Sequence, residues 1–266
     1  MTQAAIASDT WTLLQAMQRQ RVSDGSISPI LSGCETAAQI LVLVWPQLGD
    51  FDSLEYAWWL QRETDLLAER DIAVRAVGIG DRDSGSQFCA YSGFDPEHLF
   101  VDPRAELHAQ LELYAGLNWN LPGLSKAQNA YVNLLLMCAG LGSPGTLKEV
   151  FRGYRGDRQA PQLIADNETV KATPLPPLKG STFRWAGGKG FQRPFELATL
   201  RLRNMMEVLG KWGTYVPDAD YLTQRGGTFL FDAEGKLVYE YRDLGLLGFA
   251  EHMNNPLDFL LDENRN

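Results

Sequence analysis

A continuous apolar run followed by a helical pattern organises the first part of the chain. Residues 40–45 are aliphatic or aromatic without interruption, which is typical of a strand buried on both faces. Apolar residues at helical spacing then predict a helix over 53–70, and a second apolar run predicts a strand over 72–79. A strand, a helix and a strand of these lengths form a parallel crossover unit.

Further elements are predicted on both sides of this unit. They are a helix over 10–22 capped by Asp9, a short helix over 84–91, a strand over 98–101, a helix over 102–116, a hairpin of strands 228–231 and 236–241, and a helix over 256–262. Parallel strands joined to an antiparallel hairpin predict an α/β fold with a mixed central sheet flanked by helices.

The residues between these elements follow a different pattern. Ser125 and Gln128 form a capping-box pattern ahead of an apolar run, Ser143 predicts the start of another short helix, and apolar spacing predicts a helix over 194–209. The stretch 155–192 is rich in proline and glycine, as linkers are. The chain is therefore expected to be one domain over 1–266, with a helical and loop insertion at 117–215 and a hairpin and helix at 216–266 that complete the core.

Composition narrows the class of protein. With 45% hydrophobic and 21% charged residues, the 266-residue chain has the composition of a globular protein. The densest apolar stretches, 40–45 and 130–141, are shorter than the ~20 residues of a membrane-spanning helix, so no span is expected. The first nine residues lack the pattern of a secretory signal, which favours the cytoplasm, or the chloroplast stroma if a transit peptide is missing.

The charge is distributed unevenly along the chain. Residues 140–212 carry 12 Lys and Arg against 6 Asp and Glu, whereas 1–139 carry 8 against 17 and 213–266 carry 4 against 10. The basic residues alternate loosely with aromatic ones, and we expect an acidic protein partner to bind there. The candidates are Arg152, Arg155, Arg158, Arg184, Trp185, Lys189 and Arg193. Nucleic acid is not expected because the overall pI is near 4.9, whereas peripheral membrane association stays open.

The segment after the first buried strand, Pro46-Gln47-Leu48-Gly49-Asp50-Phe51-Asp52-Ser53-Leu54-Glu55, carries a family resemblance. Together with 88–103 and 226–229, it resembles the peroxiredoxin-like AhpC/TSA family of thioredoxin-fold proteins. The string 48–56 is also similar to a branch found in photosynthetic organisms. The resemblance implies a thioredoxin-like fold and antioxidant thiol chemistry. In redox-active relatives, Gly-Cys-x-x-Cys opens the helix after this strand, with the first cysteine nucleophilic.

The chain departs from the family at both cysteine positions. Aligned on Gly49, the first cysteine falls on Asp50 and the second on Ser53. A carboxylate cannot be oxidised as a thiol is, so we expect thiol peroxidase chemistry to be lost at this position. Asp52 and Glu55 instead form the pattern of a capping box at a helix start.

An arginine precedes the predicted hairpin at the place where thioredoxins have a cis-proline. In many peroxiredoxins an arginine at this entry steadies the thiolate and the peroxide, and Arg225 lies one residue early for that role. The sequence leaves two alternatives open: Arg225 pairs with Asp50, or it faces solvent.

Three cysteines, three histidines and a glycine-rich loop complete the chemical inventory. Cys138 and Cys89 lie in apolar surroundings and are expected to be buried, whereas Cys34 is the one expected to be exposed. The spacing of cysteines and histidines predicts neither a disulfide framework nor a metal site, and the loop 187–190 lacks the spacing of a phosphate-binding loop, so no cofactor is expected.

Two rival functions remain at this point. One is an antioxidant oxidoreductase that uses Cys89 or Cys34 as the nucleophile. The other is a glutathione-binding protein in which Ser53 activates the bound thiol. The paired Trp58 and Trp59 add a third open question, since they are covered either by the 117–215 insertion or by a partner.

Overall fold

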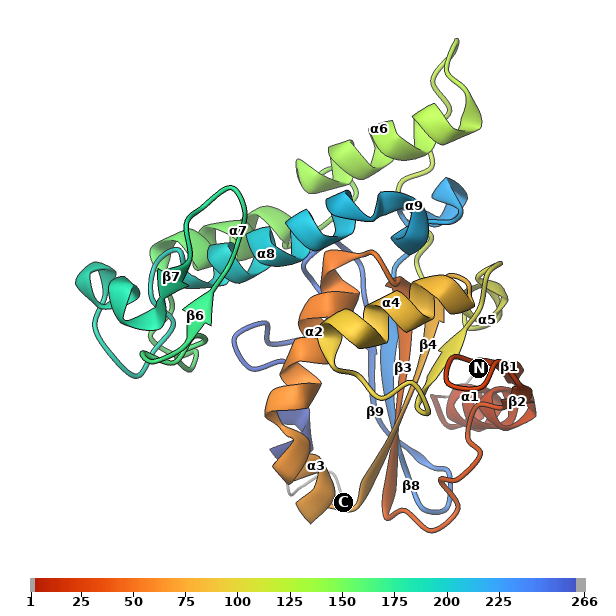
Figure 1. Cartoon of the computed structure of the whole chain (residues 1–266). Coiled ribbons are helices and arrows are strands. Elements are labelled where there is room, and N and C mark those ends of the chain that lie inside the picture. The colour runs from red at the N-terminus through yellow and green to blue at the C-terminus, as the bar shows by residue number, and fades with distance from the viewer. Residues whose placement is uncertain (1–2, 262–266) are drawn as a thin grey trace.

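A computed structural model describes residues 3–261, and seven of their strands form one mixed sheet in the order β2-β1-β5-β4-β3-β8-β9 (Figure 1). The strands are β1 (Gln18–Arg21), β2 (Ile27–Pro29), β3 (Gln39–Gln47), β4 (Ile72–Ile79), β5 (Leu99–Val101), β8 (Gly227–Asp232) and β9 (Leu237–Arg242). Strands β3, β4 and β5 run parallel, and the β8–β9 hairpin pairs antiparallel with β3. The predicted mixed sheet is confirmed.

Helices cover both faces of this sheet and also form a segment beyond it (Figure 1). They are α1 (Gln3–Ala16), α2 (Phe51–Arg62), α3 (Thr64–Glu69), α4 (Arg82–Ser92), α5 (Glu106–Gln110), α6 (Lys126–Cys138), α7 (Thr146–Arg155), α8 (Glu196–Gly210) and α9 (Trp212–Tyr215), with short 3-10 helices at Gly180–Ala186, Ala219–Tyr221 and Asp258–Leu261.

The packing of the central strand β3 on both faces explains why its residues 40–45 are all apolar. Leu41 and Leu43 pack into the cluster shared with α2 and α4, whereas Ile40, Val42 and Val44 pack on the other face, in the cluster that includes residues of α1. A strand covered on both faces has no polar side. This burial fixes the end of β3, and hence the start of α2, deep in the molecule.

The 117–215 segment adds no strand to the main sheet. It contains α6 to α9 and a separate two-stranded sheet of β6 (Thr169–Val170) and β7 (Leu178–Lys179). Figure 1 shows α7, α8 and this small sheet together beyond α2, and α8 packs on α2 while α9 packs on α4. As predicted, Ser125 and Gln128 form a capping box at the start of α6.

Several predicted helix boundaries are wrong for identifiable reasons. The helix predicted over 10–22 is α1, which begins before Asp9, so Asp9 lies within the helix and is not its N-cap. After α1 the chain forms β1, which pairs with β2 and β5. The helix predicted over 102–116 is only five residues long, because Ala105 and Glu112 adopt positive φ of 51° and 54° at its two ends.

Other boundaries shift by smaller amounts. The helix predicted over 53–70 begins at Phe51 and breaks at Glu63, and the helix predicted from Ser143 begins only at Thr146, after Gly145. The C-terminal helix is a short 3-10 turn, and its predicted last residue, 262, lies outside the described residues.

Candidate functional site

Asp50 occupies the turn between β3 and α2. It is the N-cap of α2, with extended backbone (φ −74°, ψ 142°), and its carboxylate accepts a hydrogen bond from the amide of Asp52 at 3.0 Å. An anion is stabilised at this place by the unpaired amides and the dipole of the helix. The capping box predicted at Asp52 and Glu55 is therefore wrong, because the helix begins two residues earlier than the pattern indicated.

Arg225 reaches Asp50 from the loop ahead of β8. Its guanidinium is fully buried, with Nη2 2.5 Å from Oδ2 of Asp50 and Nη1 3.3 Å from Oδ2 of Asp52. Nε also donates to the carbonyl of Thr223 at 3.1 Å. Of the two alternatives for Arg225, the structure shows the ion pair with Asp50.

Two more carboxyls, those of Asp52 and Asp243, lie near the same guanidinium. Asp52 is 1% exposed and accepts from the amide of Leu247 at 2.9 and 3.0 Å. Burial and the charge of Asp50 raise the pKa of Asp52 well above its usual range. Burial likewise raises the pKa of Asp243 to about 7, against the opposing effects of Arg225 and the Gly226 amide. One buried cation facing three carboxyls favours retention of a proton in the cluster.

A glycine allows the loop that follows Arg225 to lie close to the end of β3. A Cβ atom on Gly226 would lie 2.2 Å from the carbonyl oxygen of Val44, so only glycine fits against the end of β3. The amide of Gly226 donates to Oδ2 of Asp243 at 3.2 Å, whereas the buried Oδ1 has no hydrogen-bond partner among the described residues.

The substitution Asp243→Asn should change how stability depends on pH. Because the pKa of Asp243 is higher in the folded chain, about 7, than in an unfolded one, its contribution to stability is complete below about pH 4 and is lost as the pH rises through 7. The side-chain amide of the variant does not titrate and can still accept from Gly226. The free energy of unfolding of the wild type minus that of the variant should therefore fall from pH 4 to pH 8 in urea titrations. A flat difference contradicts this assignment.

Ser53 and Glu55 have structural partners. Ser53 is fully buried, and its hydroxyl donates to the carbonyl of Gln47 at 3.0 Å, so it is not placed to activate a bound thiol. Glu55 receives two hydrogen bonds from Arg201 of α8, at 2.7 and 3.0 Å, and Arg201 also reaches Glu149 of α7 at 2.7 Å. These ion pairs join α2 to the 117–215 segment.

A cavity of about 220 Å³ lies over Asp50 and Asp52, and Cys138 is part of its wall. Cys138 was expected to be a buried core residue, but it is exposed and ends α6, opposite the start of α2. Partial desolvation and the charge of Asp50 raise the pKa of its thiol. The sequence pattern around Cys138 shows only an apolar helix, and nothing in it signals a position beside Asp50.

The other two cysteines lie in the core. Cys89 is buried as predicted, and burial raises the pKa of its thiol to about 12. The expectation that Cys34 is exposed is wrong, because it packs with Leu14 and Ile30 and is 2% exposed; burial raises the pKa of this thiol as well. Neither thiol has the lowered pKa of a reactive cysteine.

The basic candidates for partner binding divide into two groups. Arg193 is fully buried and pairs with Glu196 at 2.6 Å and with Asp166 at 3.0 Å, and Arg152 pairs with Glu149 at 2.7 Å. These two arginines hold the 117–215 segment together, so they do not form a free basic surface as the sequence suggested. Arg184 is partly exposed and also pairs with Asp166.

The remaining candidates lie on the surface. Arg155, Arg158 and Lys189 are exposed and form no ion pair within residues 3–261, and Trp185 is 81% exposed. Of the two tryptophans of α2, Trp59 is buried and Trp58 is half-buried, with the guanidinium of Arg62 4.7 Å from the Trp58 ring.

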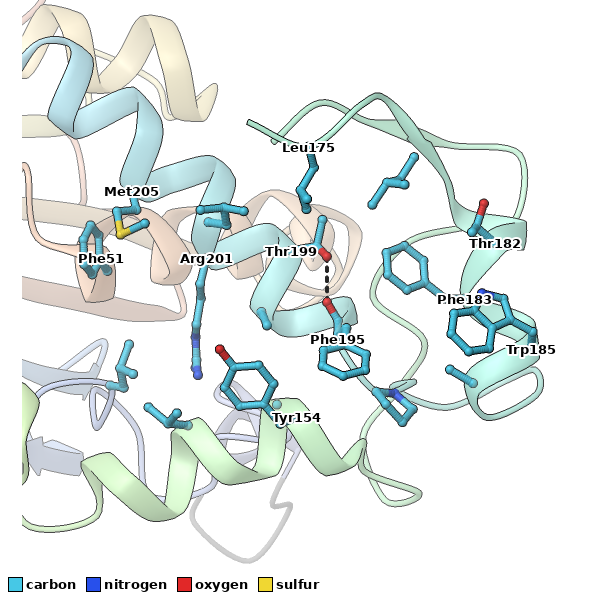
Figure 2. Close-up of a pocket in the computed structure, with 18 residues that line it drawn as sticks. Phe51, Tyr154, Leu175, Thr182, Phe183, Trp185, Phe195, Thr199, Arg201 and Met205 are labelled. Atoms are coloured by element: carbon cyan, nitrogen blue, oxygen red, sulfur yellow. Dashed lines mark hydrogen bonds between the residues drawn. The ribbon is translucent and has the colours of Figure 1, made fainter. Parts of the chain in front are cut away.

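A larger apolar groove lies beside the site. Its volume is about 580 Å³, and Figure 2 shows its walls, formed by α7, α8 and the chain around Phe183. Phe51, Val150 and Leu247 line both the groove and the smaller cavity, so the two adjoin. The charge of Arg201 in the groove wall is already balanced by Glu55 and Glu149.

Two classes of site were also sought throughout the part of the chain that the structure describes. Within residues 3–261, no three His, Cys, Asp or Glu side chains are grouped as metal ligands would be. In the same range, no helix combines the length and the apolar character needed to cross a bilayer.

The parallel β3–β4–β5 unit, its antiparallel hairpin and the helix that begins at the end of β3 define a protein with a thioredoxin-like fold. Comparison with family profiles then identifies the particular branch: residues 59–245 match the family described as AhpC/TSA antioxidant enzyme. The chain belongs to this family. The match begins inside α2 and so does not include Asp50 or Ser53. No curated protein sequence matches the chain.

Proposed function

We propose that this protein has lost the thiol peroxidase chemistry of its family at Asp50 and acts by binding a protein partner. The ion pair between Asp50 and Arg225 is the observation that carries the proposal. A thiolate at the start of this helix would be stabilised by the same amides and the same guanidinium. In this protein the carboxylate of Asp50 binds both the helix amides and the guanidinium. Its oxygen atoms cannot attack a peroxide and be oxidised as a thiolate is.

Cys138 supports a second candidate, because it lies in the wall of the cavity over Asp50. In that candidate the protein is a thiol-dependent oxidoreductase, with Cys138 in place of the nucleophiles Cys34 and Cys89 that the sequence suggested. The raised pKa of the Cys138 thiol argues against it, because the thiolate is the reactive species and Asp50 disfavours it. The three free cysteines fit a reducing compartment, and we propose the cytoplasm or the chloroplast stroma.

Peroxide consumption with a thiol reductant distinguishes the two candidates. We expect the wild type to consume hydrogen peroxide no faster than a variant in which Cys34, Cys89 and Cys138 are all replaced by serine. Turnover that disappears with Cys138→Ser alone assigns the second candidate. Turnover that survives replacement of all three cysteines contradicts both, since it would need a reactive group other than a thiol.

A further inference from the structure

Helix α7 turns its charged face inward and an apolar stripe toward solvent. Glu149 and Arg152 lie on the inner face, with side chains 7% and 18% exposed, and pair with each other. Leu147, Phe151 and Tyr154, spaced four and three residues apart, are 47%, 54% and 52% exposed. Surface helices of globular proteins normally have the opposite arrangement. The stripe is therefore an apolar face that stays about half exposed within residues 3–261.

The stripe continues into the apolar groove beside α8. The ring of Tyr154 packs against Phe195 with 5.7 Å between centroids, and both residues line the groove (Figure 2). Trp185, 81% exposed, stands at the same groove. A small molecule that filled the groove would leave Leu147 and Phe151 in water. The extent of the apolar surface therefore fits a macromolecule better than a small ligand.

Cations flank this apolar surface without acidic partners. Lys148 and Arg155 lie along one side of the stripe on α7, and the guanidinium of Arg155 lies 5.8 Å from the centre of the Phe151 ring. Both cations are exposed, and neither forms an ion pair within the described residues. The acidic Glu149 is already paired with arginines. The unpaired charges beside this surface are therefore positive, so a molecule with complementary charge is acidic.

We propose that the outward face of α7 and the adjoining groove dock an amphipathic helix of a partner protein, apolar on one face and acidic beside it. This inference rests on the proposed partner-binding function and adds the chemistry of the partner. Apolar side chains three and four residues apart would fill the groove and cover the stripe, while carboxylates meet Lys148 and Arg155.

Two other occupants fit the surface less well. The rest of this chain is acidic, but a second copy bound through that region would dock head to tail, which produces a ring or an open filament and not a simple two-fold dimer. A membrane surface is flat on the scale of the groove and would leave its depth unfilled. Both occupants are outcomes of the experiment.

The experiment measures the fluorescence anisotropy of a labelled synthetic amphipathic helix of about five turns, with leucine on one face and glutamate on the other, as the full-length protein is added. We expect saturable binding that weakens at least tenfold with the double substitution Lys148→Glu and Arg155→Glu or with Trp185→Ser. Binding should also weaken at high salt. The controls Lys236→Glu on the hairpin and Ile27→Ser on β2, which is 66% exposed, should leave binding unchanged.

Four results overturn the inference: no binding of the acidic helix, equal binding of a helix with lysine in place of glutamate, sedimentation with anionic phosphatidylglycerol vesicles without helix binding, and self-association abolished by Phe151→Ser. The peroxide assay on the same samples separates this inference from the proposed function. Absent helix binding with absent turnover rejects the docked helix alone, whereas turnover rejects the lost peroxidase chemistry whatever the helix does.

Discussion

Replacing Arg225 with methionine should lower the free energy of unfolding by about 3–5 kcal/mol at pH 7.5, the usual cost of removing one partner from a buried ion pair. Methionine keeps most of the apolar stem, so the main loss is the charge. Asp50, Asp52 and Asp243 would then share a buried site without a cation. Because the pKa values of Asp52 and Asp243 are already raised, these carboxyls take up protons as the pH falls, and the loss should be smaller at pH 5.

Urea unfolding at the two pH values measures this effect. Arg225→Lys keeps a positive charge and should lose less, whereas Arg158→Met, which removes an exposed arginine without an ion pair, should stay within about 0.5 kcal/mol of the wild type. A loss for Arg225→Met of under 1 kcal/mol at pH 7.5, or one that is equal at both pH values, contradicts the buried charge cluster.

The substitution Asp50→Cys should create a reactive thiol. In a chain with Cys34, Cys89 and Cys138 replaced by serine, Asp50→Cys would place the only sulfhydryl group at the N-terminus of α2, within reach of Arg225. Helix amides and a neighbouring arginine lower thiol pKa values from about 8.5 into the range of about 3.5–7.5. At pH 6.5 the thiol should therefore react with iodoacetamide roughly tenfold faster than an ordinary surface thiol.

The matched control is Asp65→Cys in the same background, an exposed position on the short helix α3. Its alkylation rate should rise with a midpoint near pH 8.5. If the thiol introduced at position 50 titrates at the same pH as the control thiol, then the guanidinium and the helix start do not form the anion site that the geometry indicates.

The elements that the sequence predicts correctly are those whose own residues show a clear hydrophobic pattern. The apolar run of β3 follows directly from its residues, because burial on both faces leaves no polar positions between its ends. Strand β4 and the hairpin β8–β9 are also predicted from their apolar residues, although β4 includes Arg75 and the edge strand β9 includes Glu240. Strand β1, with the sequence Gln-Arg-Gln-Arg, has no such pattern, and only its pairing with β2 and β5 makes it a strand. Its polar side chains made it indistinguishable from the end of a helix.

The site depends on contacts that a single sequence does not contain. The local pattern predicts a helix start close to Asp50, two residues later than the structure has it. Arg225 lies 175 residues away, and the roles of Asp52 and Asp243 arise only from their shared burial around it. Arg193 is expected on the surface because the sequence does not show that its neighbour Glu196 and Asp166, 27 residues away, pair with it in the interior. Cys138 is part of the cavity wall because the fold brings the end of α6 and the start of α2 to the same cavity.

The central claim is that no cysteine of the wild-type protein has replaced the missing nucleophile, and site-resolved oxidation tests it most directly. The protein is exposed to equimolar hydrogen peroxide at pH 7.5, any sulfenic acid is trapped with dimedone, and peptides are quantified by mass spectrometry over time. We expect Cys34, Cys89 and Cys138 to be oxidised no faster than free cysteine in the same tube. Oxidation of Cys138 orders of magnitude faster than free cysteine would show that the site keeps a peroxide-reactive thiol.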